Sequence, residues 1–256
     1  MTLKSRLIFF AALILVSVQT QAQNLPVLVD LAKEQKWQEL ASLLEEGLNP
    51  NAIYGDGTTA LHWASYHDNS DAIENLLSAN ANVNATTDLG VTPLWLAAEN
   101  GNSDAVDILL AAGADPRIQL LSGETAIMTA AQAGNGDVVR SLLRAGGDPN
   151  ISVTREQTAL MWAAARGHAS VVEALLEYGA DVEAISLVRE QYVKSEKEQD
   201  SHPSYKYWIE QGGNSALMFA ARSGDLGSTE LLVEARSDDN QVSAIGTRPA
   251  IMAVHG

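Results

Sequence analysis

One short pattern returns along the chain at a fixed spacing of 33 residues. It starts with a threonine and continues with small and apolar residues, and the four threonines are Thr59, Thr92, Thr125 and Thr158. A looser copy starts at Ser215, 57 residues after the last of them. A fixed period of this size is typical of arrays in which each repeat buries its apolar face against its neighbours. The chain is therefore expected to hold one repeat domain.

Each copy has the parts of a short helix. A threonine or serine before a helix accepts hydrogen bonds from the free N–H groups of the first turn. Pro93 falls at a first helical position, where its missing N–H does no harm. A glycine lies nine residues after the threonine or serine in four of the copies, at Gly101, Gly134, Gly167 and Gly224. Because glycine tolerates positive φ, the first helix is expected to end there and the chain to turn back.

A second helix is expected directly after this turn. Asn69, Asn102 and Asn135 are good N-caps for it. Apolar residues then recur at i, i+3 and i+4, which places them in one stripe of a helix. These sets are Ile73-Leu76-Leu77, Val106-Leu109-Leu110, Val139-Leu142-Leu143 and Val172-Leu175-Leu176. A further Gly, or Asn80 in the first full copy, is expected to end this helix.

The unit of two short helices with two turns closely resembles the ankyrin repeat. The family's signature, Gly-x-Thr-Pro-Leu-His-x-Ala-Ala-x-x-Gly-His, reads here as Gly57-Thr-Thr-Ala-Leu-His-Trp-Ala-Ser-Tyr-His-Asp-Asn69 and its copies. The resemblance covers about residues 28–256. It implies an all-α fold, an ankyrin-repeat solenoid of stacked helix-turn-helix units joined by hairpin-like loops.

The domain boundaries follow from this resemblance. Residues 23–256 are expected to form the repeat domain. Its parts are a polar cap at 28–51, full repeats at 52–84, 85–117, 118–150 and 151–184, an insert at 185–212, a repeat at 213–245 and an incomplete repeat at 246–256.

Residues 1–22 have the pattern of a secretory signal peptide. Lys4 and Arg6 precede an apolar run, and Thr20-Gln-Ala22 is a small-x-small-like cleavage site. The run is too short for a comfortable membrane span. We therefore expect a periplasmic or secreted protein that has no membrane contact after signal cleavage. An uncleaved N-terminal anchor is the alternative.

The insert at 185–212 has 24 residues more than a normal connection between repeats. It is charged in the middle and aromatic towards both ends, where Tyr192, Tyr205, Tyr207 and Trp208 lie. Loops of this length in compact repeats are usually functional or disordered. Two interpretations stay open: the insert extends a binding surface, or it folds back over the junction between repeats.

The chain carries no motif of a known catalytic, phosphate-binding or metal-binding type, and it has no cysteine. It is therefore expected to be no enzyme and to hold no cofactor. His62 occupies the histidine position of the repeat, where the resemblance implies a structural hydrogen bond between loops. His67 follows one turn later, and this pair is the sole local support for a metal site. Large apolar residues at one repeat position are interpreted as core packing; they are Trp63, Leu96, Trp162 and Phe219.

The formal net charge of −16 argues against nucleic-acid binding, because an acidic chain repels phosphate and has no basic stripe. Acidity is compatible with a basic protein partner.

In ankyrin-repeat proteins a partner usually meets the concave side, which is formed by the loop tips and the ends of the first helices. The resemblance places the following residues on that surface, together with aromatic residues of the insert. The candidates are Tyr66, His67, Leu89, Val91, Glu99, Asn100, Leu121, Gln132, Arg155, Arg166, Tyr205, Tyr207, Trp208 and Arg222.

The sequence thus predicts an exported scaffold that binds a protein partner through this surface. Two alternatives remain. One is an accessory stress factor or metal-linked factor that acts with an enzyme. The other is a truncated array without independent function.

Overall fold

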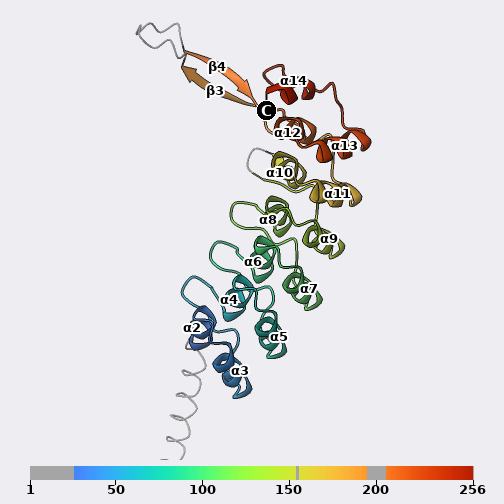
Figure 1. Cartoon of the computed structure of the whole chain (residues 1–256). Helices are drawn as coiled ribbons and strands as arrows, with labels where there is room; N and C mark the ends of the chain where they lie inside the picture. Colours follow the sequence, from blue (N-terminus) through green and yellow to red (C-terminus); the bar gives the residue numbers. More distant parts are fainter. Residues whose placement is uncertain (1–25, 154–155, 195–205, 256) are drawn as a thin grey trace, which may run out of the picture. The chain divides into compact units, whose positions relative to one another are not determined.

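The computed structural model describes residues 26–153, 156–194 and 206–255 (Figure 1). The predicted signal peptide, Arg155 and Tyr205 lie outside these residues. Contacts within the chain define two units, each of which is described by itself. The first comprises the chain to Ala97 together with Asp104–Asp115, and the second comprises Ala98–Ser103 and the chain from Pro116 onwards.

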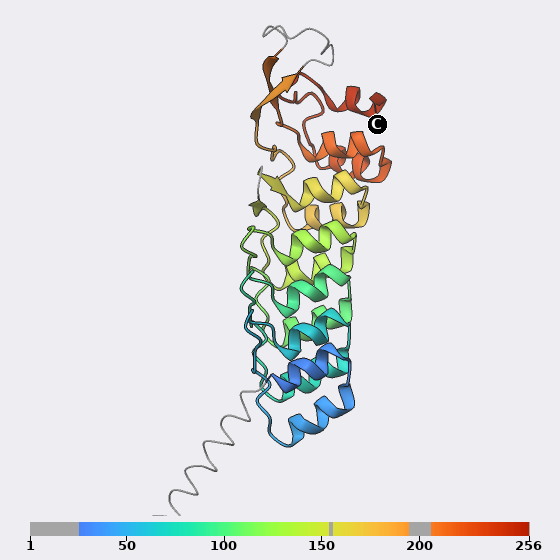
Figure 2. The ribbon, with the colours of Figure 1, turned by 90° about the vertical axis from the view of Figure 1, so that its left-hand side faces the viewer.

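The first unit consists of paired short helices. They are α2 (Val27–Lys33), α3 (Trp37–Glu45), α4 (Ala60–Tyr66), α5 (Ser70–Ser78), the part of α6 (Pro93–Asn100) up to Ala97, and α7 (Ser103–Ala111) from Asp104 onwards. The first helix of one pair packs on the first helix of the next, α2 on α4, and α3 packs on α5 in the same way. Loops that precede the first helices extend to one side of this unit (Figure 2).

The second unit repeats this arrangement and adds strands. Its elements are α8 (Ala126–Ala133), α9 (Gly136–Arg144), β1 (Ser152–Val153), β2 (Gln157–Thr158), α10 (Ala159–Arg166), α11 (Ala169–Glu177), β3 (Arg189–Lys194), β4 (Lys206–Gln211), α12 (Ala216–Ser223), α13 (Leu226–Glu234) and α14 (Pro249–His255). The first helices α8, α10, α12 and α14 pack on one another in this order, as do the second helices α9, α11 and α13. The predicted all-α repeat fold of paired helices is confirmed.

Small side chains bring the first helices together. Ala130, Ala163, Ala164 and Ala220 are fully buried where α8, α10 and α12 meet. A buried alanine lets two helix backbones approach closely, which a larger side chain would prevent. The second helices supply the larger apolar residues, since α9 buries Val138, Val139, Leu142 and Leu143.

Three of the predicted threonine caps are present, and two predicted caps are wrong. The hydroxyl oxygens of Thr59, Thr92 and Thr158 accept hydrogen bonds from the backbone N–H three residues further on, at 3.4, 3.1 and 3.4 Å. Among the described residues, the hydroxyl groups of Thr125 and Ser215 are buried without a hydrogen-bond partner. The backbone at Thr125 (φ −110°, ψ 166°) closely matches that at Thr158 (φ −98°, ψ 165°), so the backbone of the cap residue does not account for the missing bond.

The predicted turns after the helices have left-handed backbone conformations. Gly134 and Gly167 follow first helices with φ of 85° and 72°. Asn80, Gln35 and Arg236 take the same conformation where the repeat lacks glycine, with φ of 66°, 58° and 65°. The left-handed turn is therefore kept even where the residue is not glycine, although a side chain makes this backbone conformation less favourable.

The predicted insert contains a pair of antiparallel strands. β3 pairs with β4 in antiparallel register, from Arg189 opposite Gln211 to Lys194 opposite Lys206. The ladder places the backbone of Tyr192 opposite that of Trp208, and Tyr207 lies opposite Val193. The sequence predicted no strands here.

Of the helices in the described part of the chain, none is sufficiently long and apolar to span a bilayer.

Candidate binding pocket

Backbone hydrogen bonds position two successive loops of the first unit. The bonds that close the loops include one from the N–H of Tyr54 to the carbonyl of Thr58 at 2.9 Å and one from the N–H of Thr87 to the carbonyl of Val91 at 3.0 Å. A third bond joins the two loop tips, because the N–H of Asp88 donates to the carbonyl oxygen of Asp56 at 2.8 Å. The two tips are therefore held side by side.

His62, at the start of α4, connects the same two repeats. Its side chain is only 2% exposed. Nδ1 lies 3.2 Å from the backbone nitrogen of Thr59 and 2.8 Å from its hydroxyl oxygen, and Nε2 lies 3.0 Å from the carbonyl oxygen of Val91. Burial lowers the pKa of His62, although the bond to Val91 partly opposes this shift. A neutral ring that accepts at Nδ1 and donates from Nε2 satisfies these contacts, which confirms the structural interpretation of His62.

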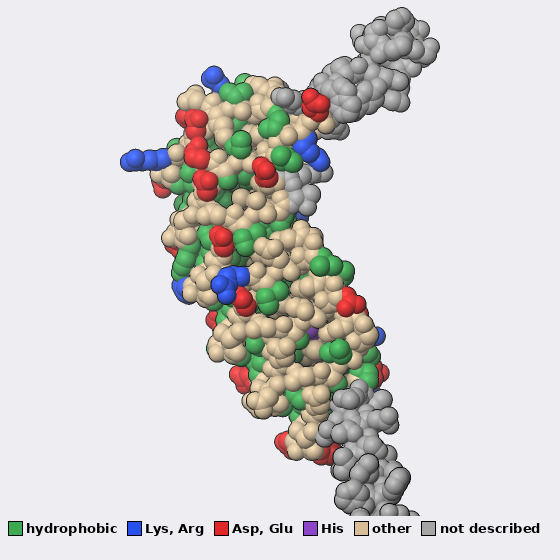
Figure 3. Space-filling model, turned by 180° about the vertical axis from the view of Figure 1, so that it is seen from behind, with side chains coloured by type: hydrophobic (Ala, Val, Ile, Leu, Met, Phe, Trp, Pro, Cys, Tyr) green, Lys and Arg blue, Asp and Glu red, His purple; other side chains and the backbone are tan. Residues whose placement is uncertain are grey.

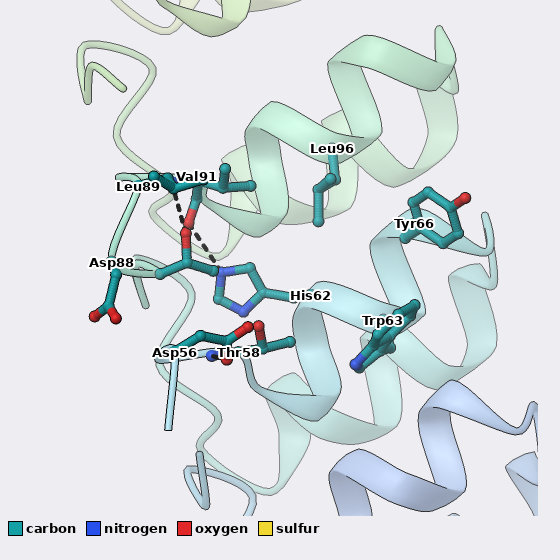
Figure 4. Close-up of a pocket in the computed structure, with 10 residues that line it drawn as sticks. Asp56, Thr58, His62, Trp63, Tyr66, Asp88, Leu89, Val91 and Leu96 are labelled. Carbon is teal, nitrogen blue, oxygen red and sulfur yellow. Dashed lines mark hydrogen bonds between the residues drawn. The ribbon is translucent and has the colours of Figure 1, made fainter. Parts of the chain in front are cut away.

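A pocket of about 460 Å³ opens beside this histidine (Figure 4). Pockets of this size hold small ligands or the anchoring side chains of a partner. Helix α4 contributes Trp63 and Tyr66, and α6 contributes Leu96. The full lining is Asp56, Thr58, His62, Trp63, Tyr66, Thr87, Asp88, Leu89, Val91 and Leu96.

One wall of the pocket is aromatic. The rings of Trp63 and Tyr66 meet edge to face, with centroids 5.7 Å apart and planes at 87°. His67 stacks on Trp63 with centroids 5.8 Å apart and planes at 23°. The Nζ atom of Lys33 lies 5.7 Å from the Trp63 ring centroid, within the range of a cation–π interaction. These neighbours hold the indole ring in place.

The opposite end of the pocket is acidic. Figure 4 shows Asp56 and Asp88 at the loop end, away from Trp63 and Tyr66. The carboxylate of Asp56 accepts a hydrogen bond from the N–H of Thr58 at 3.0 Å, which lowers the pKa of Asp56 and keeps it ionised. No lysine or arginine lies among the residues that line this pocket.

The structure brings three of the predicted partner-binding residues into this pocket, namely Tyr66, Leu89 and Val91. Tyr66 is 51% exposed and Leu89 is 65% exposed, which is unusual for large apolar side chains. His67 lies next to the pocket, against Trp63 and Tyr66.

The other predicted residues lie outside this pocket. Glu99, Asn100 and Arg166 are exposed, and Leu121 is 78% exposed. Gln132 is half-buried, and its carbonyl oxygen lies 3.1 Å from Nε2 of His168. Arg222 lines two smaller pockets in the second unit. Arg155 and Tyr205 are outside the described residues, and Tyr207 and Trp208 belong to β4.

Sequence reasoning missed the role of Trp63 and Leu96. Both were interpreted as core packing, but both are half-buried and line the pocket. Their equivalents Trp162 and Phe219 are half-buried as well. The sequence did show that these residues occupy the same position in successive repeats, and residues at one position share one face of their helices. That signal does not distinguish a packed face from a pocket wall.

The residues that the structure describes include no group of three or more His, Asp or Glu side chains able to hold a metal ion. Both ring nitrogens of His62 are engaged by Thr59 and Val91, and His67 stacks on Trp63. The geometry of these two histidines thus favours a structural role for each.

Comparison with known proteins identifies the family. The family model described as "Ankyrin repeats (3 copies)" matches residues 28–120 and 94–186, which together make up more than half of the chain. The chain therefore belongs to the ankyrin-repeat family. Such repeats generally serve as protein-interaction scaffolds, and the fold is typically non-enzymatic.

Among solved structures, the human ASB11 ankyrin repeat domain has the same fold. Its TM-score is 0.69 at 24% identity, and the match covers 88% of this chain and 90% of that domain. Comparison with curated proteins finds no relative of similar sequence.

Proposed function

We propose that this protein is an exported scaffold that binds a protein partner against the loop side of its first unit. The pocket between the loop tips and α4 is the observation that carries this proposal, because it combines an aromatic wall with exposed apolar side chains. Tryptophan and tyrosine are enriched among residues that dominate binding energy at protein interfaces. Tyr66 and Leu89 are the side chains that a partner would cover first.

Support for export comes from the signal-peptide pattern of residues 1–22. A fusion of these residues to a reporter enzyme that is active only after export tests this part. We expect an active reporter, and an inactive one when Leu13→Arg interrupts the apolar run. An active Leu13→Arg fusion, or an inactive wild-type fusion, would contradict export.

Partner binding is tested with the chain from Gln23 onwards as bait in an extract of the producing cells. Tyr66→Ser and Leu89→Ser each remove an exposed side chain from the pocket. Leu226→Ser is a matched control, because Leu226 is 69% exposed but lies in α13 of the second unit.

A partner should bind the wild type and the Leu226→Ser variant equally. The two pocket variants should bind it about tenfold less, in line with the loss of one anchoring side chain. Equal capture by all four proteins would disprove the assigned surface.

A further inference from the structure

We infer that the pocket receives the side chain of an arginine from the partner, with its guanidinium group at the Asp56–Asp88 end and its aliphatic stem along Trp63 and Leu96. This inference rests on the proposed function and adds the chemistry of the partner to it.

The first argument is the arrangement of charge. The backbone bond of 2.8 Å from Asp88 N to Asp56 O holds two acidic loop tips together, and both side chains are exposed. Among the ten residues that line the pocket, none is a lysine or an arginine that would compensate them. Two acidic side chains on adjoining loop tips attract a cation and repel an acidic group, so they select the sign of charge on the partner.

The second argument is the aromatic wall. Trp63 already attracts a cation of the chain itself, because Nζ of Lys33 lies 5.7 Å from its ring centroid. An arginine whose guanidinium group reaches the Asp56–Asp88 end lays its stem, not its charge, along this ring. The methylene groups of its stem match an apolar wall that Leu96 and Val91 continue (Figure 4).

The third argument concerns His62, which lies between these two ends (Figure 4). Burial lowers the pKa of His62, so the ring is neutral near pH 7. The side chains that line the pocket therefore carry negative charge only, at Asp56 and Asp88.

Arginine fits this combination better than lysine or an apolar residue. A guanidinium group is weakly hydrated and forms planar hydrogen bonds with carboxylates, whereas the lysine ammonium is strongly hydrated. An apolar side chain would fill the aromatic end and leave the two carboxylates without a partner. The formal net charge of −16 extends the same preference to the chain as a whole, in which acidic and basic side chains both lie on the face shown in Figure 3.

The test is an NMR titration of the chain from Gln23 onwards with three capped pentapeptides. They carry arginine, citrulline or norleucine between pairs of glycines. Citrulline has nearly the shape of arginine without its charge, and norleucine presents only an aliphatic stem. Peptides this short are expected to bind with a dissociation constant of about 1–10 mM.

We expect saturable shifts from the arginine peptide, confined to the amides of residues 56–66 and 87–96. The citrulline and norleucine peptides should bind at least about fivefold more weakly, since they lack the charge-assisted contacts. Asp56→Asn and Asp88→Asn should each weaken binding of the arginine peptide, whereas Asp71→Asn, an exposed position in α5, should not. The amide spectrum of each variant shows whether it is folded.

Equal binding of norleucine, shifts outside the pocket, or no saturable shift with arginine would each overturn the inference. Capture of a partner that depends on Leu89 would still stand in those cases, so the two proposals fail separately.

Discussion

His62 links two repeats through Nε2, which donates to the carbonyl of Val91, and only the neutral ring can also accept at Nδ1 from the N–H of Thr59 in its own repeat. Its pKa is lowered from 6.5 by burial in the folded protein. The unfolded chain therefore binds the proton more readily, and stability is fully present above about pH 6.5. It is lost as the pH falls from there towards the lower pKa of the folded state.

Urea unfolding at pH 7.5 and pH 5.0 measures this effect. The wild type should lose more stability on acidification than His62→Gln, whose amide cannot be protonated in this range. His67→Gln, measured in the same way, gives a second histidine substitution for comparison. The same loss in the wild type and in His62→Gln would contradict the assignment of the pH dependence to His62.

A second set of side chains links successive repeats, and the sequence did not predict it. Asn51, Asn84 and Asn150 occupy one position of the 33-residue repeat. Each amide nitrogen donates to a carbonyl 29 residues further on, at 3.0 to 3.1 Å, and each amide oxygen accepts from an N–H 31 residues further on. Asparagine in a loop normally indicates a local turn, so the sequence alone concealed this non-local role.

Asn150→Ala should lower the free energy of unfolding by about 1 kcal/mol, because it leaves the N–H of Asp181 and the carbonyl of Gly179 without these bonds. Asn240→Ala is the control, since the side-chain amide of Asn240 donates to the adjacent Asp239, a local bond that links no repeats. Chemical denaturation measures both variants. Equal effects would show that the link between repeats adds no stability.

At the scale of one helix and its turn, glycine serves two separable purposes. Gly134 ends α8 with φ of 85°, and a Cβ added there would lie 2.8 Å from the His168 ring. Gly179 has a similar φ of 81° with no atom within 4 Å of that position. Comparing alanine substitutions at Gly134 and Gly179 therefore separates the cost of a strained backbone from the cost of a steric clash.

Gly179→Ala should cost about 1 kcal/mol, the usual penalty for a left-handed alanine. Gly134→Ala should cost clearly more, because the His168 ring must also move and its contact of 3.1 Å with the carbonyl of Gln132 is disturbed. Thermal and urea unfolding of both variants measure the difference. An equal cost would mean that the neighbouring ring adapts freely.

The helices and their turns were predictable because their signals are local. Asparagine caps, the i, i+3, i+4 stripes and the glycine breaks each act within one element, and Asn69 and Asn135 cap their helices as expected. The hydroxyl orientations of Thr125 and Ser215 depend on surroundings that the sequence does not display. Strand β3 was missed because the segment from Arg189 to Lys194 is mostly charged or polar and lacks the β-branched pattern of a strand. The β4 segment does contain strand-forming residues, Tyr207, Trp208 and Ile209, and that local signal was not used.

At the scale of the molecule, the second unit is not uniformly packed. Helix α9 buries five residues, whereas α13 buries only Ser228 and Leu232 and exposes Leu226 and Val233. Regions with few buried apolar residues open at lower free energy. The amides of α13 should therefore exchange with solvent faster than those of α9.

Hydrogen exchange followed by mass spectrometry tests this comparison. Peptides from residues 226–234 should lose protection well before peptides from residues 136–144. Equal protection of the two helices would indicate a single cooperative unit and contradict the inference from burial.

The candidate site was predictable only in part, because it needs side chains from two repeats. Family resemblance indicated the loop side, and Tyr66, Leu89 and Val91 do meet there. Trp63 and Leu96 were assigned to the core, since an apolar residue at a repeated position does not reveal whether a neighbour covers it. Whether a neighbour covers such a side chain is decided only by how one repeat stacks on the next.

The most direct test of the central claim is photo-crosslinking in the producing cells. A benzophenone amino acid replaces Leu89 in one variant and Leu226 in the other, two leucines of similar exposure in different units. We expect one discrete protein to be crosslinked at position 89 and none at position 226. A partner crosslinked at 226 but not at 89 would contradict the assignment of the binding surface to the pocket of the first unit.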